Sequence, residues 1–173
     1  AVRNAVESVD SGTYERMAHA IDELVPRGIG NGEMVTQLTA LAHGPRFGDI
    51  LELVPTLHRT VLNGYEVVPV AERVLASGRS AEIAAHVNAL ADDDIAYMSL
   101  VQSLQGMLDH PQLDRILQVA RTVRDAGSDV HTLDKARLLV EHPRSDDALD
   151  VLKFITDTAG PGGKFMQDFL AHA

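Results

Sequence analysis

The sequence predicts an all-α fold in which helix-hairpin repeats of about 32–35 residues stack as a short α-solenoid or a compact helical bundle. Hydrophobic residues make up 45% of the 173-residue chain, whereas aromatic residues make up only 4% and Trp is absent. A core built from Leu, Val, Ala and Ile is typical of packed helices, because long β-rich chains rely more on aromatic residues and Thr. An internal repeat and a helical spacing of apolar residues support the same fold class.

The repeat is visible when the chain is compared with itself. Residues 108–127, LDHPQLDRILQVARTVRDAG, return 32 residues later as VEHPRSDDALDVLKFITDTAG over 140–160. The matching positions are His110 and His142, Pro111 and Pro143, Asp114 and Asp146, Leu117 and Leu149, Val119 and Val151, Val123 and Ile155, and Asp125 and Asp157. Looser copies of the turn occur near His43 and Gly78, so turn markers fall at 43, 78, 110 and 142. Such a period is typical of stacked two-helix units.

Each repeat is expected to contain a first helix, a turn with Pro or Gly, and a second helix. The first helices are expected near 33–42, 65–76, 96–109 and 132–141, and the second near 48–62, 81–91, 113–125 and 146–158. Within 96–109 the apolar residues follow the spacing of one buried helix face. Ser80, Asp114 and Ser145 are expected as N-caps, and the aspartates at 92–94 as the cap of a helix that begins at Ile95.

Two prolines fall inside predicted helices. Pro55 lies in the middle of the helix expected over 48–62, where a missing backbone donor costs about 3 kcal/mol unless packing outweighs it. We therefore expect a bend of more than about 20° at Pro55. Pro69 lies about one turn into its helix, where the missing donor matters less.

Composition excludes several classes of function. A net charge of −10 disfavours nucleic acid as a partner, because phosphate backbones would be repelled. The chain has no Cys, which excludes disulfides, thiolate nucleophiles and Cys-ligated metals. No segment resembles a signal peptide, and the longest charge-free stretch, 95–108, is too short to span a membrane. The sequence therefore predicts a soluble, cytoplasmic protein without a transmembrane segment.

Candidate chemical motifs are few. Glu15 with His19 and Glu82 with His86 are spaced i, i+4, whereas di-iron bundles require i, i+3, so both pairs are interpreted as surface pairs. The turn histidines at 43, 110 and 142 suit the C-terminal ends of helices, and His58 is interpreted as structural. GPGGKF at 160–165 lacks the spacing of a phosphate loop. We therefore predict no catalytic, cofactor-binding or metal-binding residue, and no enzyme activity.

Residues 50–75 carry a resemblance to a known family. A leucine-rich helix, the VPTLH motif, a short turn and a second apolar helix ending in Gly resemble small helical proteins of unknown function that are encoded beside formate dehydrogenases and hydrogenases. The resemblance implies an accessory or scaffolding subunit of a redox enzyme complex. It carries over no catalytic residue, because the matched motif contains none.

The functional prediction is a non-catalytic protein–protein interaction scaffold or accessory subunit that acts in a homo-oligomer or a larger enzyme complex. The alternative is a binder of an apolar small molecule, such as a lipid or a quinone, between kinked helices. Residues 1–160 are predicted to form the helical repeat domain, and 161–173 a glycine-tethered docking or capping helix. In that helix Phe165, Met166, Phe169 and Leu170 share one side and are the candidate partner-docking residues. Docking on the same chain and docking on another subunit both remain open.

Overall fold

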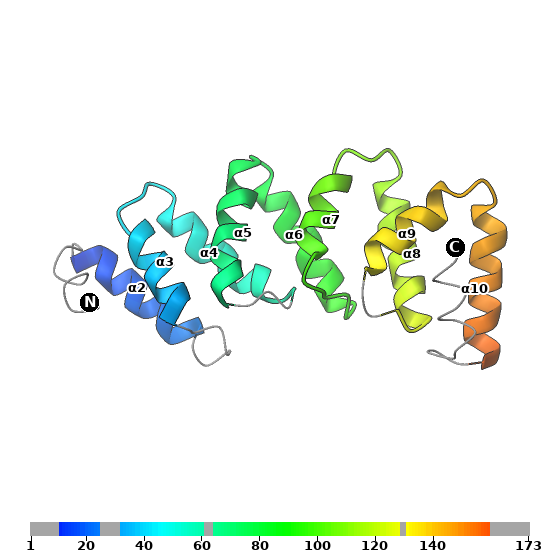
Figure 1. The fold of residues 1–173 in the computed structure, drawn as a ribbon, viewed down its shortest axis with the longest axis horizontal. Helices are drawn as coiled ribbons and strands as arrows, with labels where there is room; N and C mark the ends of the chain where they lie inside the picture. The colour runs from blue at the N-terminus through cyan, green and yellow to red at the C-terminus, as the bar shows by residue number, and fades with distance from the viewer. Residues whose placement is uncertain (1–10, 25–31, 61–63, 129–130, 160–173) are drawn as a thin grey trace. The chain divides into compact units, whose positions relative to one another are not determined.

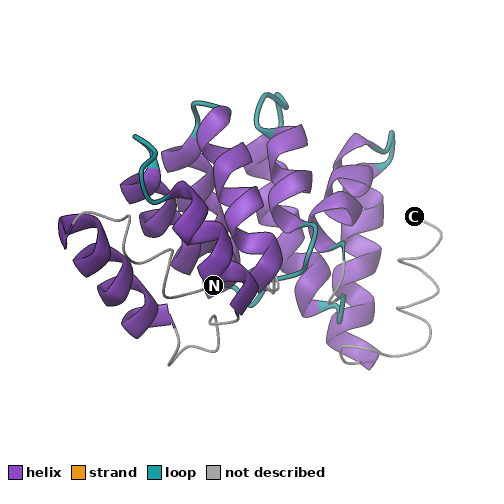
Figure 2. Cartoon of the chain, turned by 60° about the vertical axis from the view of Figure 1, so that its left-hand side comes forward, coloured by secondary structure: helices purple, strands orange, loops and turns teal. Residues whose placement is uncertain are grey.

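The fold is all-α, as predicted. The computed structural model describes residues 11–24, 32–60, 64–128 and 131–159, and these contain nine helices and no strand (Figures 1 and 2). The helices are α2 (Ser11–Leu24), α3 (Gly32–Leu41), α4 (Phe47–His58), α5 (Gly64–Ala76), α6 (Ser80–Asp92), α7 (Leu100–Met107), α8 (Leu113–Asp125), α9 (Thr132–Glu141) and α10 (Ser145–Ala159). None of these described helices is long and apolar enough to span a membrane.

The chain divides into two compact units, Ala1–Ala85 and His86–Ala173, and the boundary falls within α6. In the first unit α5 packs against α3 and α4, and α2 against α3. In the second unit α9 packs against α7, α8 and α10. The fully buried side chains are mainly aliphatic, and the largest are Met34, Leu38, Leu57, Ile83, Leu90, Ile95, Leu100, Leu104, Ile116 and Leu133. Stacking of the repeats across 1–160 stays a prediction.

All eight predicted helices have counterparts in the structure, with two notable differences at their ends. The helix expected over 96–109 begins only at Leu100, and the helix expected over 48–62 ends at His58. The second difference puts Pro55 in the last turn of α4 rather than in its middle. The helix gives way there to tighter bonds, from Arg59 N–H to the Thr56 carbonyl (3.1 Å) and from Thr60 N–H to the Leu57 carbonyl (3.0 Å). Pro55 lacks the N–H that would bond the Leu51 carbonyl, but less than one further turn of α4 depends on the helix continuing past it. The bend at Pro55 stays a prediction.

The two copies of the repeat share the same local structure at their turns. His110 lies three residues after the end of α7 and His142 directly follows α9. Each accepts a hydrogen bond on Nδ1 from the backbone N–H two residues later, at 3.1 Å. Asp114 and Asp146 are the second residues of α8 and α10, as the repeat predicts. Ser80 and Ser145 are first helical residues, so all three expected N-caps lie one or two positions inside their helices.

In the second unit, side chains about one repeat apart join the α7–α8 hairpin to the α9–α10 hairpin. His110 Nε2 lies 3.2 Å from Glu141 Oε1, and Ser103 Oγ donates a 2.8 Å hydrogen bond to Asp134. Arg115 donates to Asp146 at 2.5 Å and to Ser145 at 3.0 Å. The partners in the ion pairs and in the Ser103 bond are 31 positions apart in the chain. These polar contacts therefore join positions that lie about one repeat apart in the chain.

The three aspartates at 92–94 end a helix instead of beginning one, so that prediction is wrong. Asp92 is the last residue of α6, and Asp94 takes a left-handed conformation with φ of 61°. Ile95 N–H bonds the Leu90 carbonyl at 2.8 Å and Asp94 N–H bonds the Ala91 carbonyl at 3.1 Å, which is a Schellman ending. Arg124 of α8 secures this ending: its guanidinium pairs with the Asp94 carboxylate, and its Nε donates to the Asp94 carbonyl at 2.9 Å.

Tyr97 supplies a buried polar contact between the segment before α7 and the start of α9. The side chain is 5% exposed, and its hydroxyl oxygen accepts a 3.3 Å hydrogen bond from Leu133 N–H. Burial raises the pKa of the Tyr97 phenol to about 12, because the charged phenolate would lose its hydration. The neighbouring Asp134 carboxylate acts in the same direction.

We predict that Tyr97 makes the protein sensitive to alkali. In the unfolded chain the phenol has a pKa of about 10, so raising the pH through 10 toward 12 deprotonates the unfolded state first and lowers the free energy of unfolding. Between about pH 9 and about pH 11 the wild type should lose about 1–2 kcal/mol more stability than Tyr97→Phe. Urea unfolding at both pH values measures the difference. Equal losses in the two proteins would contradict the assignment, and Tyr14→Phe, at an exposed tyrosine, is the matched control.

Candidate functional site

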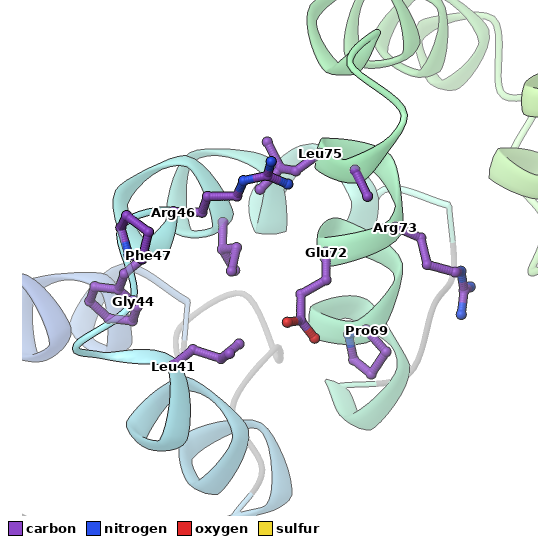
Figure 3. Close-up of a pocket in the computed structure, with 11 residues that line it drawn as sticks. Leu41, Gly44, Arg46, Phe47, Pro69, Glu72, Arg73 and Leu75 are labelled. Carbon is purple, nitrogen blue, oxygen red and sulfur yellow. The ribbon is translucent and has the colours of Figure 1, made fainter.

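The candidate site is a groove in the first unit, formed by the end of α3, the turn to α4, the start of α4 and one side of α5 (Figure 3). Its volume is about 620 Å³. The lining residues are Leu41, Gly44, Pro45, Arg46, Phe47, Ile50, Pro69, Glu72, Arg73, Leu75 and Ala76. Most of these are apolar, and several are exposed to solvent, so the groove opens at the surface.

The α3–α4 turn forms one wall. Gly44 N–H donates to the Leu41 carbonyl at 2.8 Å, and Phe47 N–H donates to the Gly44 carbonyl at 3.2 Å. A Cβ at Gly44 would lie 3.1 Å from the Leu41 carbonyl oxygen, so the tight turn favours glycine. Pro45 follows and prevents α3 from continuing. The turn thereby brings Leu41 and Phe47 into the lining of the same hollow, and Leu41 extends toward its centre (Figure 3).

The opposite wall is one face of α5. Pro69, Glu72, Leu75 and Ala76 are spaced three or four residues apart, which puts them along one side of the helix. The next side of α5 is buried, with Val67, Ala71 and Val74 fully covered. The groove therefore lies at the edge of the core and not inside it.

The groove also carries three charges. Glu72 directs its carboxylate into the hollow, Arg46 extends from the other wall toward Leu75, and Arg73 points away (Figure 3). Within the described part of the chain, no ion pair is found for any of these three side chains. An apolar floor with unpaired charges at its rim is the arrangement of a binding site for an amphipathic surface.

The motifs considered from the sequence lie elsewhere. Glu82 is held by Arg79 through contacts of 2.7 and 2.8 Å. Among the described residues no group of three or more His, Asp or Glu side chains is arranged to hold a metal ion. The predicted docking residues Phe165, Met166, Phe169 and Leu170 lie outside the described residues. The sequence analysis missed the groove, although the GP turn at 44–45 and Pro69 are both part of it.

Comparison with known proteins adds no further constraint: no family model, curated protein or solved structure matches the chain. What the fold and the groove define is a class, an all-α protein with an open apolar groove.

His58, the last residue of α4, is half-buried. Its burial lowers the pKa of the imidazole below the usual 6.5, because the charged form is less well hydrated. His58 lies at the C-terminal end of α4, where the helix carbonyl groups favour a charged imidazole, but this position does not reverse the lowering of its pKa. The lowered pKa fits the structural role that the sequence indicated and makes a charged imidazole unfavourable there.

We predict that His58 destabilises the fold in mild acid. As the pH falls through about 6.5, the unfolded state takes up the proton first, so the stability present at neutral pH is lost. Between about pH 7.5 and about pH 5.5, the melting temperature of His58→Gln should therefore fall by less than that of the wild type. Thermal unfolding followed by circular dichroism measures this. His43→Gln, at an exposed turn histidine, is the control, and an identical acid response of wild type and His58→Gln would contradict the prediction.

Proposed function

We propose that the protein is a non-catalytic interaction domain, an accessory or scaffolding subunit whose first unit receives a helix of a protein partner in the groove between α3, α4 and α5. The observation that carries this proposal is the groove itself: an open, mostly apolar hollow of about 620 Å³ with unpaired charges at its rim. Grooves of this kind accept the apolar face of an amphipathic helix in many complexes.

The charges indicate what the partner helix should carry. Its apolar side chains would cover Leu41, Phe47 and Leu75, while a basic residue would meet Glu72 and an acidic residue would meet Arg46. Such pairs at the edge of an interface fix orientation and speed association more than they add affinity.

A non-catalytic role is supported by the use of the polar side chains in the second unit. Ser103, Asp134, Arg115, His110 and Glu141 all make contacts that join one hairpin to the next. The groove offers a single carboxylate and two guanidinium groups, without a nucleophile or an imidazole in its lining. These three charged groups of the groove suit the recognition of a partner.

The resemblance of residues 50–75 to helical proteins encoded beside formate dehydrogenases and hydrogenases supports a redox enzyme complex as the assembly. This segment contains most of α4 and nearly all of α5, the helices that form much of the groove. A homo-oligomer is the other form of association that we propose, and the proposed location is the cytoplasm. The net charge of −10 is consistent with a protein that recognises proteins instead of nucleic acid.

We predict that Leu75→Glu abolishes partner binding, because it puts a charge on the apolar wall of the groove. Chemical cross-linking in native lysate, followed by affinity purification and mass spectrometry, should recover a protein partner with the wild type. That partner should be lost with Leu75→Glu and weakened by at least about tenfold with Arg46→Glu.

The matched control is Leu138→Glu, the same exchange at a 50% exposed leucine of α9. It should retain the partner, and circular dichroism should show all three variants folded. A partner that is lost equally with the groove and control variants, or retained with Leu75→Glu, would overturn the proposal.

A second candidate function, binding of an apolar small molecule such as a lipid or a quinone, is favoured by the size of the same groove. The volume of the groove lies within the range of about 300–1,000 Å³ typical of small-molecule sites. Pro69, which lies inside α5, is part of its lining. Native mass spectrometry of the purified protein separates the two functions. A small-molecule adduct that is present in the wild type and absent in Leu75→Glu would favour this second function over the first.

A further inference from the structure

The last described helix, α10, carries an exposed apolar face. Phe154 is 69% exposed and Val151 is 46% exposed, and the two side chains lie one turn apart on the same side of the helix. The buried side of α10 is different and includes Leu152. Large apolar side chains that are adjacent and exposed in this way indicate a surface that another segment covers.

The repeat shows what covers the corresponding face one hairpin earlier. Val119 of α8 matches Val151 of α10, yet Val119 is only 5% exposed. Val119 lies one turn after Arg115, whose guanidinium bonds Ser145 and Asp146 at the start of α10, so this side of α8 faces α10. In the α7–α8 hairpin this face of α8 is therefore covered by α10, which belongs to the next hairpin. Among the described residues no helix follows α10 to cover its matching face.

Residues 161–173 have the sequence to supply it. Phe165, Met166, Phe169 and Leu170 are spaced so that they would share one side of a helix. The connection is also long enough: Phe154 lies about 7.5 Å along the helix axis from Ala159 at about 1.5 Å per residue, and residues 160–163 can span about 13 Å. The segment can therefore return beside Val151 and Phe154 without strain. A tether this short also favours the same chain over a second copy, because it raises the effective concentration.

We propose that residues 161–173 dock in cis on the face of α10 formed by Val151 and Phe154 and cover these apolar side chains. This inference is independent of the groove in the first unit. It also chooses between the two docking modes that the sequence left open.

Cysteine cross-linking tests the proposal on the full chain, which has no native Cys. Under mild oxidation at low protein concentration, Val151→Cys/Phe169→Cys should form an intrachain disulfide, seen by mass spectrometry as the loss of two hydrogens. Lys153→Cys/Phe169→Cys is the matched control, because Lys153 is exposed but about 200° around the helix from Val151. The first pair should react at least about tenfold faster than the control.

Each other outcome of that experiment overturns the proposal. Equal rates for the two pairs would mean that the tail does not prefer this face, and interchain disulfides would mean that the face pairs with a second copy. Stability supplies a readout that does not need cysteines. If the face is covered, Phe154→Ser and Phe169→Ser should each lower the melting temperature by several degrees, and the double variant by clearly less than the sum. An unchanged melting temperature in Phe154→Ser would also overturn the proposal.

Discussion

The constraint on which the structure depends is that a helix hairpin made of Leu, Val, Ala and Ile cannot bury its own apolar sides. Each helix is narrow, and with aromatic residues at 4% of the chain there are few large side chains to close the core. Helix α9 illustrates the solution, since it packs against α7, α8 and α10 and buries Leu133, Ala136 and Leu139. Burial in a chain of this composition comes from neighbouring hairpins, which is the basis of stability in repeat proteins.

That constraint also determines how the polar residues are used. Side chains such as Arg115 and Glu141 lie where one hairpin meets the next, and they pair across that boundary. These partly exposed pairs each contribute little free energy. Their value lies in register, because a shift of one residue between the hairpins would separate Ser103 from Asp134 and Tyr97 from Leu133 at the same time.

The sequence was sufficient to predict most helices, because their signals are local: an apolar period near 3.6 residues, and Pro or Gly at the turns. It failed where a distant partner decides the conformation. The aspartates at 92–94 resemble a helix start, but Arg124 holds Asp94 at a helix end, and a contact 30 residues away leaves no local signal. The N-caps were displaced by one or two residues, which local patterns do not resolve. The groove was missed for the same reason as Asp94, since its walls come from three helices and a turn.

At the groove, the first unit has smaller residues than the second unit has at the matching positions of the sequence repeat. By the turn markers, Gly78 after α5 corresponds to His142 after α9, so Ala76 and Ser77 correspond to Val140 and Glu141. In the second unit Val140 is buried and Glu141 meets His110, which closes the junction between the first helices of the two hairpins. In the first unit the smaller Ala76 and Ser77 neither fill that place nor reach across it, and Ala76 lines the groove. A hollow lined by such small residues at the edge of the core leaves the fold of its unit intact. The proposed recognition site therefore needs no dedicated domain.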